Sequence, residues 1–175
     1  MGEFFLKAAI TAAMTQLGKD PRTIFVGQNV CYPGHVVYET LQGVPEAQRL
    51  EVPVVENTQM GLCTGLALAG YLSICIFPRM DFMLLAMDQL VNHLDKLEEM
   101  SRGQFRPKVI IRTMLGNTEP LHPGPQHCQD YTGALRLMLK HCAVFAPRTV
   151  GGLNHSYGFA EINDISTIIV EPAYR

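Results

Sequence analysis

The residues with the clearest capacity for proton transfer are a glutamate and a histidine that each follow a predicted strand. Glu56 comes directly after the apolar segment VPVV, and Asn57 and Thr58 could cap a helix that runs from there to about Gly70. Ligands of open parallel α/β sheets gather at such strand-to-helix junctions. His127 lies in GNTEPLHPGPQHCQD, whose prolines and glycines predict a long, functional loop. Taken alone, Glu56 is more simply explained as a surface or helix-terminal charge and His127 as a loop histidine bonded to backbone.

Two other chemistries use the same residue types. Cys128 beside His127, with Asp130 close by, has the composition of a thiol hydrolase, but sequence neighbours seldom direct their side chains at one another and no separate base is evident. The remaining histidines have no metal-ligand spacing with cysteine or carboxylate support: His35, His93, His122, His141 and His155. We therefore predict neither a thiol enzyme nor a metal site.

The elements that must position these residues alternate between strands and helices. We expect helices over residues 3–17, 56–70, 81–100 and 131–141, and strands over residues 23–30, 49–55, 73–78, 107–115, 143–147 and 165–172. Apolar, β-branched runs of this kind are typical of strands buried on both faces. The alternation predicts a single α/β domain over residues 1–175, a three-layer, mostly parallel sheet with helices on both faces.

Composition excludes several classes of protein. Of 175 residues, 47% are hydrophobic and 17% charged, which argues against disorder, and a net charge of −2 supplies no attraction to nucleic acid or to a membrane surface. No run of 18 apolar residues occurs, and the first 20 residues fit an amphipathic helix better than a signal peptide. The cysteines are odd in number and lack a CxxC pair, which favours reduced thiols in the cytoplasm over disulfides or zinc.

Four segments carry a resemblance to a known family: PVVENTQMGLCTGLALAGY, FPRMDFMLLAMDQLVNHLDKL, VIIRT with the loop after it, and GPQHCQD. They resemble the pyrimidine-binding domain of thiamine-diphosphate enzymes. The nearest variety is the beta subunit of the decarboxylating component of 2-oxoacid dehydrogenases, and transketolase-like domains are broader relatives. The resemblance extends from about Lys7 to the terminal VEPAYR and implies the thiamine-diphosphate-binding fold.

The resemblance implies a catalytic role for two residues. Glu56 matches the glutamate that hydrogen-bonds N1′ of the aminopyrimidine, where proton exchange favours the imino tautomer that removes the thiazolium proton. Burial of this carboxyl would raise its pKa. His127 matches the histidine that handles protons on the substrate side, and Gln126 and Gln129 match its neighbours.

The same resemblance implies a cofactor pocket around the aminopyrimidine. Phe82 matches the aromatic residue that stacks on this ring, and Val54 and Pro78 belong to the wall. Pro78 stands where the family commonly has another apolar residue, and Arg79 follows it, so this wall departs from the pattern.

Three glycines follow Glu56 at positions where the family also has glycine: Gly61, Gly65 and Gly70. Glycine inside a helix costs roughly 1 kcal/mol relative to alanine, so close packing against a second helix or subunit is the expected reason for them.

The sequence lacks the GDG motif that holds the cofactor's diphosphate through Mg²⁺. It also lacks the C-terminal domain of related beta subunits. We therefore expect a split thiamine-diphosphate enzyme of the 2-oxoacid dehydrogenase type, whose alpha-type partner supplies the diphosphate half in a two-fold dimer or heterotetramer. A transketolase-type two-carbon transfer subunit and a non-catalytic regulatory or assembly subunit are the alternatives.

Residues 141–166 depart most from the family pattern. Related beta subunits have a regular helix there, and some hold a structural potassium ion nearby. Gly151, Gly152 and the polar segment NHSYG argue against both features, so we expect neither.

Overall fold

A computed structural model describes residues 2–119 and 122–173; Tyr174 and Arg175 of the terminal VEPAYR lie outside this range. The strands are β1 (Thr23–Gly27), β2 (Arg49–Glu51), β3 (Leu72–Phe77), β4 (Val109–Met114), β5 (Ala143–Phe145) and β6 (Thr167–Glu171). The α-helices are α1 (Gly2–Leu17), α2 (Val36–Thr40), α3 (Glu56–Leu68), α4 (Met80–Met83), α5 (Leu97–Met100), α6 (Thr132–Met138) and α7 (Val150–Ile162). Shorter or wider helical turns are η1 (Glu46–Gln48), η2 (Leu84–Ala86), η3 (Asp88–Leu94) and η4 (Pro125–His127).

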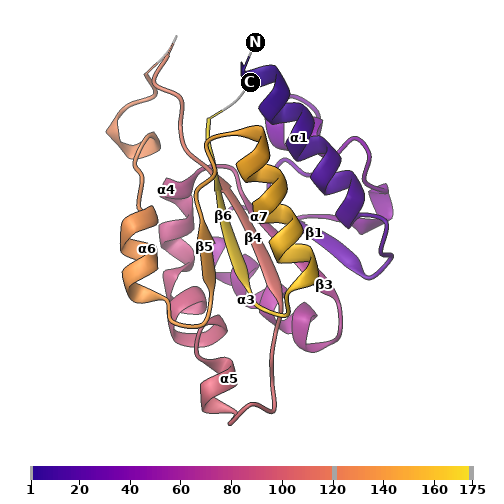
Figure 1. Cartoon of the computed structure of the whole chain (residues 1–175), viewed down its shortest axis with the longest axis vertical. Helices are drawn as coiled ribbons and strands as arrows, with labels where there is room; N and C mark the ends of the chain where they lie inside the picture. Colours follow the sequence, from indigo (N-terminus) through magenta and orange to yellow (C-terminus); the bar gives the residue numbers. More distant parts are fainter. Residues whose placement is uncertain (1, 120–121, 174–175) are drawn as a thin grey trace.

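The six strands form one sheet in the order β2-β1-β3-β4-β6-β5, and every neighbouring pair is parallel. All residues of β4 and β6 are buried, as the β-branched runs predicted. The all-parallel sheet confirms the expected α/β architecture. It also places the carboxyl ends of all strands at one edge of the sheet. The loops that carry the predicted site residues begin at this edge (Figure 1).

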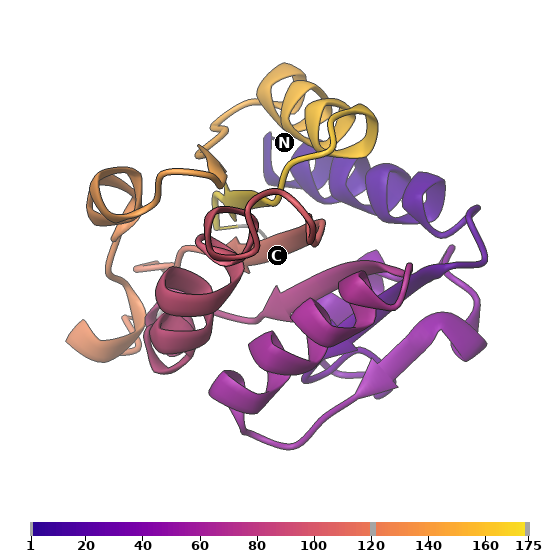
Figure 2. The same ribbon diagram turned by 90° about the horizontal axis from the view of Figure 1, so that it is seen from below.

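Helices cover both faces of the sheet. Figure 2 shows α1 and α7 on one side, with α3 and the helical turns after β3 on the other. One core cluster fills the α1 and α7 side, including Met14, Phe25 and Leu153; a second fills the opposite side, including Met60, Phe77 and Leu90. Alternate residues of β3 and β4 supply both clusters, since successive strand residues point to opposite faces.

Helix α3 begins at Glu56, the first residue of the expected range, but the predicted cap is wrong. Val55 is its N-cap and makes no side-chain capping bond, so Asn57 and Thr58 lie inside the helix and do not cap it. The first turn is held instead by Gln59, which is 1% exposed and whose Nε2 donates to the Ile76 carbonyl 2.9 Å away on β3.

The glycines after Glu56 have different surroundings. A Cβ on Gly61 would lie 3.1 Å from the Gln89 side chain, so close packing occurs there. A Cβ on Gly65 would meet nothing within 4 Å, and Gly70 lies after the helix with φ +89°, which favours glycine. Packing of Gly65 against another subunit stays a prediction.

The single long helix expected over residues 81–100 is wrong. The segment is divided into α4, η2, the π-helical η3 and α5. The wide turn ends with Asp95 N donating to Leu90 O at 2.9 Å. Because a π turn brings residues five apart toward one face, Leu90, Leu94 and Asp95 are all buried together.

The expectation that residues 141–166 lack a regular helix is also wrong. Helix α7 covers Val150–Ile162, and Thr149 caps it by accepting a 3.1 Å bond from Gly152 N. Gly151 and Gly152 lie in its first turn, and the buried side chains recur at helical spacing: Leu153, Ser156, Tyr157 and Ala160. Packing against α1 and the sheet outweighs the low helix propensity of the glycines.

Candidate cofactor site

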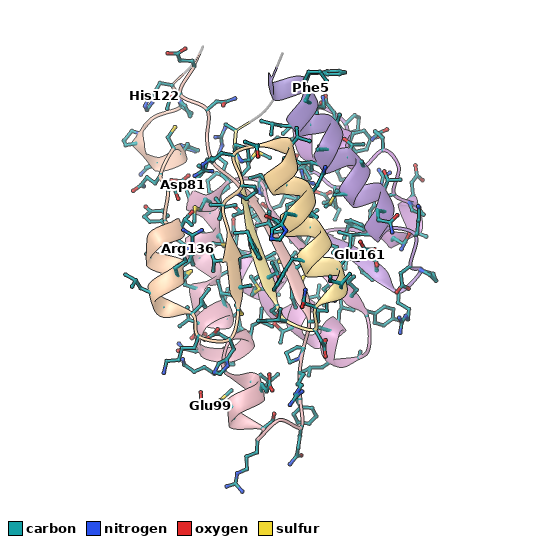
Figure 3. All side chains as sticks on the ribbon, viewed as in Figure 1. Phe5, Asp81, Glu99, His122, Arg136 and Glu161 are labelled. Carbon is teal, nitrogen blue, oxygen red and sulfur yellow. The ribbon has the colours of Figure 1, made fainter. Side chains whose placement is uncertain are left out.

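The predicted site residues come together at the carboxyl edge of the sheet. Glu56 follows β2, Phe82 follows β3 and His127 lies in the loop after β4. Figure 3 places Asp81, the neighbour of Phe82, toward the same upper end as His122 of this loop, whereas Glu99 lies at the opposite end. Three loops from different strands thus converge where parallel α/β sheets bind ligands.

Glu56 is the first residue of α3 and is only 5% exposed. A carboxylate there is favoured by the positive end of the helix dipole. In the described part of the chain, no donor bonds to its side chain, although Gln59 fixes the same helical turn to β3. A buried carboxylate without a donor is an acceptor ready for a ligand's N–H group.

Phe82 and His127 are in direct contact. Their ring centroids are 5.6 Å apart and the planes are nearly perpendicular, at 89°, which is the favoured edge-to-face geometry. His127 Nδ1 is buried and has no hydrogen-bond partner among the described residues. The contact therefore orients the imidazole while leaving a ring nitrogen to interact with a bound molecule.

The loop that carries His127 is fastened to α4 by three backbone contacts. Arg79 Nη1 donates to the His127 carbonyl at 3.2 Å, Gln129 N donates to Asp81 Oδ1 at 3.3 Å, and Tyr131 N lies 3.3 Å from the Met80 sulfur. Each contact joins residues 48 to 51 positions apart in the sequence. The segment that begins α4 therefore positions both the Phe82 ring and the imidazole.

Gly116 makes this arrangement sterically possible. A Cβ at this position would lie 1.7 Å from the His127 carbonyl oxygen and 2.7 Å from Arg79 Nη1. No side chain fits there, so the loop after β4 can close onto His127 only with glycine at residue 116.

The other predicted pocket residues differ in exposure. Pro78 directly follows β3 and is buried, whereas Val54, two residues before Glu56, is 74% exposed. Gln126 and Gln129 are exposed on the loop. Their roles toward a cofactor stay predictions, as do those of Glu56, Phe82 and His127.

Sequence reasoning missed the residues that hold this edge together. Glu51, at the end of β2, accepts hydrogen bonds from the backbone N–H groups of Asn29, Val30 and Cys31 at 2.7 to 2.9 Å. It thereby fixes the loop after β1, where Asn29 has the unusual φ of +59°. The one sequence signal for this role of Glu51 is a carboxylate at the end of a short strand. The hydrogen-bond partners of Glu51 are backbone groups, which no sequence pattern reveals.

The thiol-hydrolase alternative finds no support in the geometry. The Cys128 thiol donates to the Asn117 carbonyl at 3.6 Å, and Asp130 bonds Thr132 N and Arg148. Neither residue is bonded to the His127 ring.

No group of three potential metal ligands occurs in residues 2–119 and 122–173, and the same ranges contain no helix long and apolar enough to cross a membrane.

Comparison with solved structures defines the class of fold. The chain superposes with a TM-score of 0.70 on a split-gene transketolase, covering 95% of this chain and 50% of that one at 16% identity. It superposes on a transketolase mutant from Pichia stipitis with a TM-score of 0.71, covering 94% and 25% of the two chains at 15% identity. The domain therefore has the transketolase-like α/β fold, as the sequence predicted.

The sequence is similar to a more particular protein within this class, the pyruvate dehydrogenase E1 component subunit beta. Identity is 34% over 122 residues with that of Cyanidium caldarium, covering 64% of this chain and 36% of the relative. It is 30% over 125 residues with that of Rickettsia bellii, covering 69% and 37%. The chain thus spans little more than a third of the length of these relatives, and no protein-family profile matches it. The resemblance to E1 beta subunits is confirmed.

Proposed function

We propose that this chain is the pyrimidine-binding subunit of a split thiamine-diphosphate enzyme that decarboxylates a 2-oxo acid and passes on the acyl or aldehyde unit. The observation that carries the proposal is the meeting of Glu56, Phe82 and His127 at one sheet edge. Similarity to beta subunits named for pyruvate dehydrogenase supports the reaction type.

The residues present fit an aminopyrimidine. The buried Glu56 carboxylate lacks a donor in the described chain, which suits an N–H group of the ring. The Phe82 side chain, half-buried at the start of α4, offers an aromatic surface for the ring to stack on, and Pro78 and Val54 would line it. His127 Nδ1 is a buried polar atom without a hydrogen-bond partner among the described residues, and it lies where the proposed site needs one.

Each residue then has one task. Glu56 holds and exchanges a proton at the ring nitrogen, and burial keeps water from competing for it. His127 handles a proton on the substrate side through its free ring nitrogen. Thiamine diphosphate, when bound, supplies the nucleophilic carbon and the electron sink for bond cleavage.

The diphosphate and Mg²⁺ would be held by an alpha-type partner chain. The chain has no GDG motif, and its described residues contain no cluster of three His, Cys, Asp or Glu side chains that could hold a metal ion. The split-gene transketolase of similar fold was solved as an inactive beta4 tetramer. By analogy, this chain alone would be inactive and would complete its site in a two-fold symmetric assembly.

We further propose the cytoplasm as the location; the five cysteines, all free, fit a reducing compartment. Matched relatives from Ascaris suum and rice are named as mitochondrial and chloroplastic. Microscopy of a tagged chain in its own cells, compared with organelle markers, decides between these compartments.

The proposal is tested by calorimetric titration of thiamine diphosphate and Mg²⁺ into the chain, the diphosphate-binding protein encoded beside it, and their mixture. Binding is expected only in the mixture, with turnover of 2-oxo acids. Glu56→Gln should lower turnover by roughly 100-fold or more, while Glu46→Gln, on the exposed turn η1, should not. Transfer of two-carbon units from ketose phosphates would favour the transketolase alternative. Absence of binding to a folded, associated mixture would overturn the cofactor site.

A further inference from the structure

Arg79 is the residue at this site whose chemistry the proposed function does not use. It is the N-cap of α4, between β3 and Phe82, and it is half-buried. Its Nη1 donates to the His127 carbonyl and would be 2.7 Å from a Cβ at Gly116. The guanidinium is therefore held against the His127 loop, inside the proposed active site.

The positive charge of Arg79 is not compensated by a carboxylate of the described chain. Its guanidinium forms no ion pair within 4 Å there, and the His127 carbonyl is the one acceptor that it contacts. Among the acids at this edge, Glu51 accepts from the loop after β1 and Glu171 is paired with Arg112. Asp81 accepts from Gln129 N through Oδ1, its buried Oδ2 has no hydrogen-bond partner among the described residues, and it forms no ion pair with Arg79 within 4 Å. Since a guanidinium has five N–H donors, most of those on Arg79 remain for a ligand.

The charge of Arg79 extends over this edge of the sheet. Burial lowers the pKa of His35, in the loop after β1, and the positive charges of Arg79 and Arg112 lower it further, against the opposing effect of Glu39. Arg112 is neutralised by Glu171, so Arg79 is the uncompensated cation. An anion entering the site would be attracted to it.

The reacting carboxylate of a 2-oxo acid is a poor partner for this cation. That group leaves as CO₂, so a cation bound to it would stabilise the substrate more than the transition state. An acidic group elsewhere on the substrate keeps its charge throughout the reaction. A carboxylate or phosphonate there would accept two parallel N–H bonds from the guanidinium.

We propose that Arg79 binds the second acidic group of a 2-oxo acid substrate and selects such diacids over pyruvate. This inference rests on the proposed function and assigns its substrate class. It uses a residue that lies on the part of the pocket wall where the sequence departs from related beta subunits.

The test uses the full chain assembled with its diphosphate-binding partner. The substrates are 2-oxoglutarate, 2-oxopentanoate of the same chain length, 3-phosphonopyruvate and pyruvate. The wild-type assembly should have a higher kcat/KM for one of the diacids than for both monoacids. The identity of the preferred diacid shows whether the second acidic group of the substrate is a carboxylate or a phosphonate.

Substitution isolates the role of Arg79. Arg79→Met should raise KM for the preferred diacid roughly 10- to 100-fold, the loss of a charge-assisted contact, and Arg79→Lys should recover part of it. Because Arg79 also holds the His127 loop, pyruvate turnover should fall too, but by less, so the ratio of diacid to pyruvate kcat/KM should decrease. The control Arg22→Met removes an exposed arginine just before β1, at the opposite end of the strands. It should change neither the KM for the diacid nor the turnover of pyruvate. Binding of the unreactive glutarate, compared with pentanoate by calorimetry, should show the same dependence on Arg79.

The outcomes separate the two proposals. If Arg79 only anchors the His127 loop, Arg79→Met lowers kcat for every substrate alike and leaves the ratio of diacid to monoacid unchanged, which overturns this inference. A wild-type preference for pyruvate overturns it while the proposed function stands. Failure to bind thiamine diphosphate and to turn over any of the four acids overturns both.

Discussion

Arg112 on β4 and Glu171 at the end of β6 form an ion pair inside the protein, with 2.9 Å between Nε and Oε1 and side chains 1% and 0% exposed. The Tyr157 hydroxyl of α7 donates to the same oxygen at 2.5 Å. In the pairing of β4 with β6, Glu171 lies opposite Met114, which is two residues after Arg112 on β4. The side chains of Arg112 and Glu171 therefore project from the same face of the sheet, the face that α7 covers. The pair joins two central strands to one helix.

Breaking this pair should strongly destabilise the fold, because Glu171 would lose the cation that it contacts in the protein interior. Arg112→Met should lower the free energy of unfolding by about 3 to 5 kcal/mol, and Tyr157→Phe by about 1 to 2 kcal/mol. Urea unfolding followed by circular dichroism measures both. Arg22→Met, which breaks an exposed pair, is the control and should leave the midpoint nearly unchanged. An Arg112→Met midpoint equal to that of the control would show that the buried pair is not needed for stability.

Asp95 should contribute stability that is lost in acid. Burial alone would raise the pKa of this carboxyl, but N–H groups of His141, Lys140 and Cys142 donate to it and hold its pKa below the usual value. The stabilisation is therefore complete above about pH 4 and is lost as the pH falls through the folded-state pKa.

Substitution tests this role directly. Asp95→Asn should lower the free energy of unfolding by about 2 to 4 kcal/mol at pH 7, and the difference from wild type should shrink below pH 4. Asp88→Asn, on the exposed side of the same turn, is the matched control. A difference for Asp95→Asn that stays constant down to pH 3 would contradict the assigned ionic interaction.

Gly116→Ala should displace the His127 loop. The added methyl group would overlap the His127 carbonyl, so the Arg79 contact must break or the loop must shift, at a cost of about 1 to 3 kcal/mol. Gly65→Ala is the matched control because a Cβ there meets open space, and in the isolated chain it should stabilise α3 by about 0.5 to 1 kcal/mol. Thermal unfolding compares the two. Unchanged NMR shifts for the His127 ring in Gly116→Ala would rule out the predicted displacement.

His35 should stay neutral at a pH where an ordinary histidine is half protonated. Burial, then Arg79 and Arg112, lower its pKa from 6.5. Because the folded state binds this proton less readily, His35 makes the protein less stable as the pH falls from 6.5 toward the folded-state pKa. Arg79→Met should raise the His35 pKa, as NMR titration of the ring would show, and should reduce the loss of stability in this range. An identical titration curve in the variant would mean that the charge of Arg79 does not reach His35.

The strands were predictable because their signals are local, and the residues whose roles in the site stay predictions were found from equally local motifs. Apolar runs such as those of β3 and β4 indicate buried strands wherever they occur, and Glu56, Phe82 and His127 stand in recognisable segments. The contact of Arg79 with His127 was not predictable, since it depends on how two loops 48 residues apart meet.

Two elements were mispredicted for physical reasons. The buried face of α7 includes Ser156, and its first turn contains two glycines, so its amphipathic pattern is weak although Thr149 supplies a cap. The π turn of η3 is favoured by the burial of Asp95, whose backbone partners come from residues 140–142. Propensity over residues 81–100 cannot report a partner so distant in sequence.

The position of β6 decides when the sheet can be completed during synthesis. This strand, the last along the described chain, lies between β4 and β5, and β5 has no other neighbour in the sheet. A nascent chain that has emerged only through β5 therefore leaves β5 unpaired, the β4 edge open and Arg112 without Glu171. Because the closing contacts join residues nearly 60 positions apart, the order of strands makes folding late and slow, and it concentrates the risk of misassembly in the interval before Thr167–Glu171 emerge.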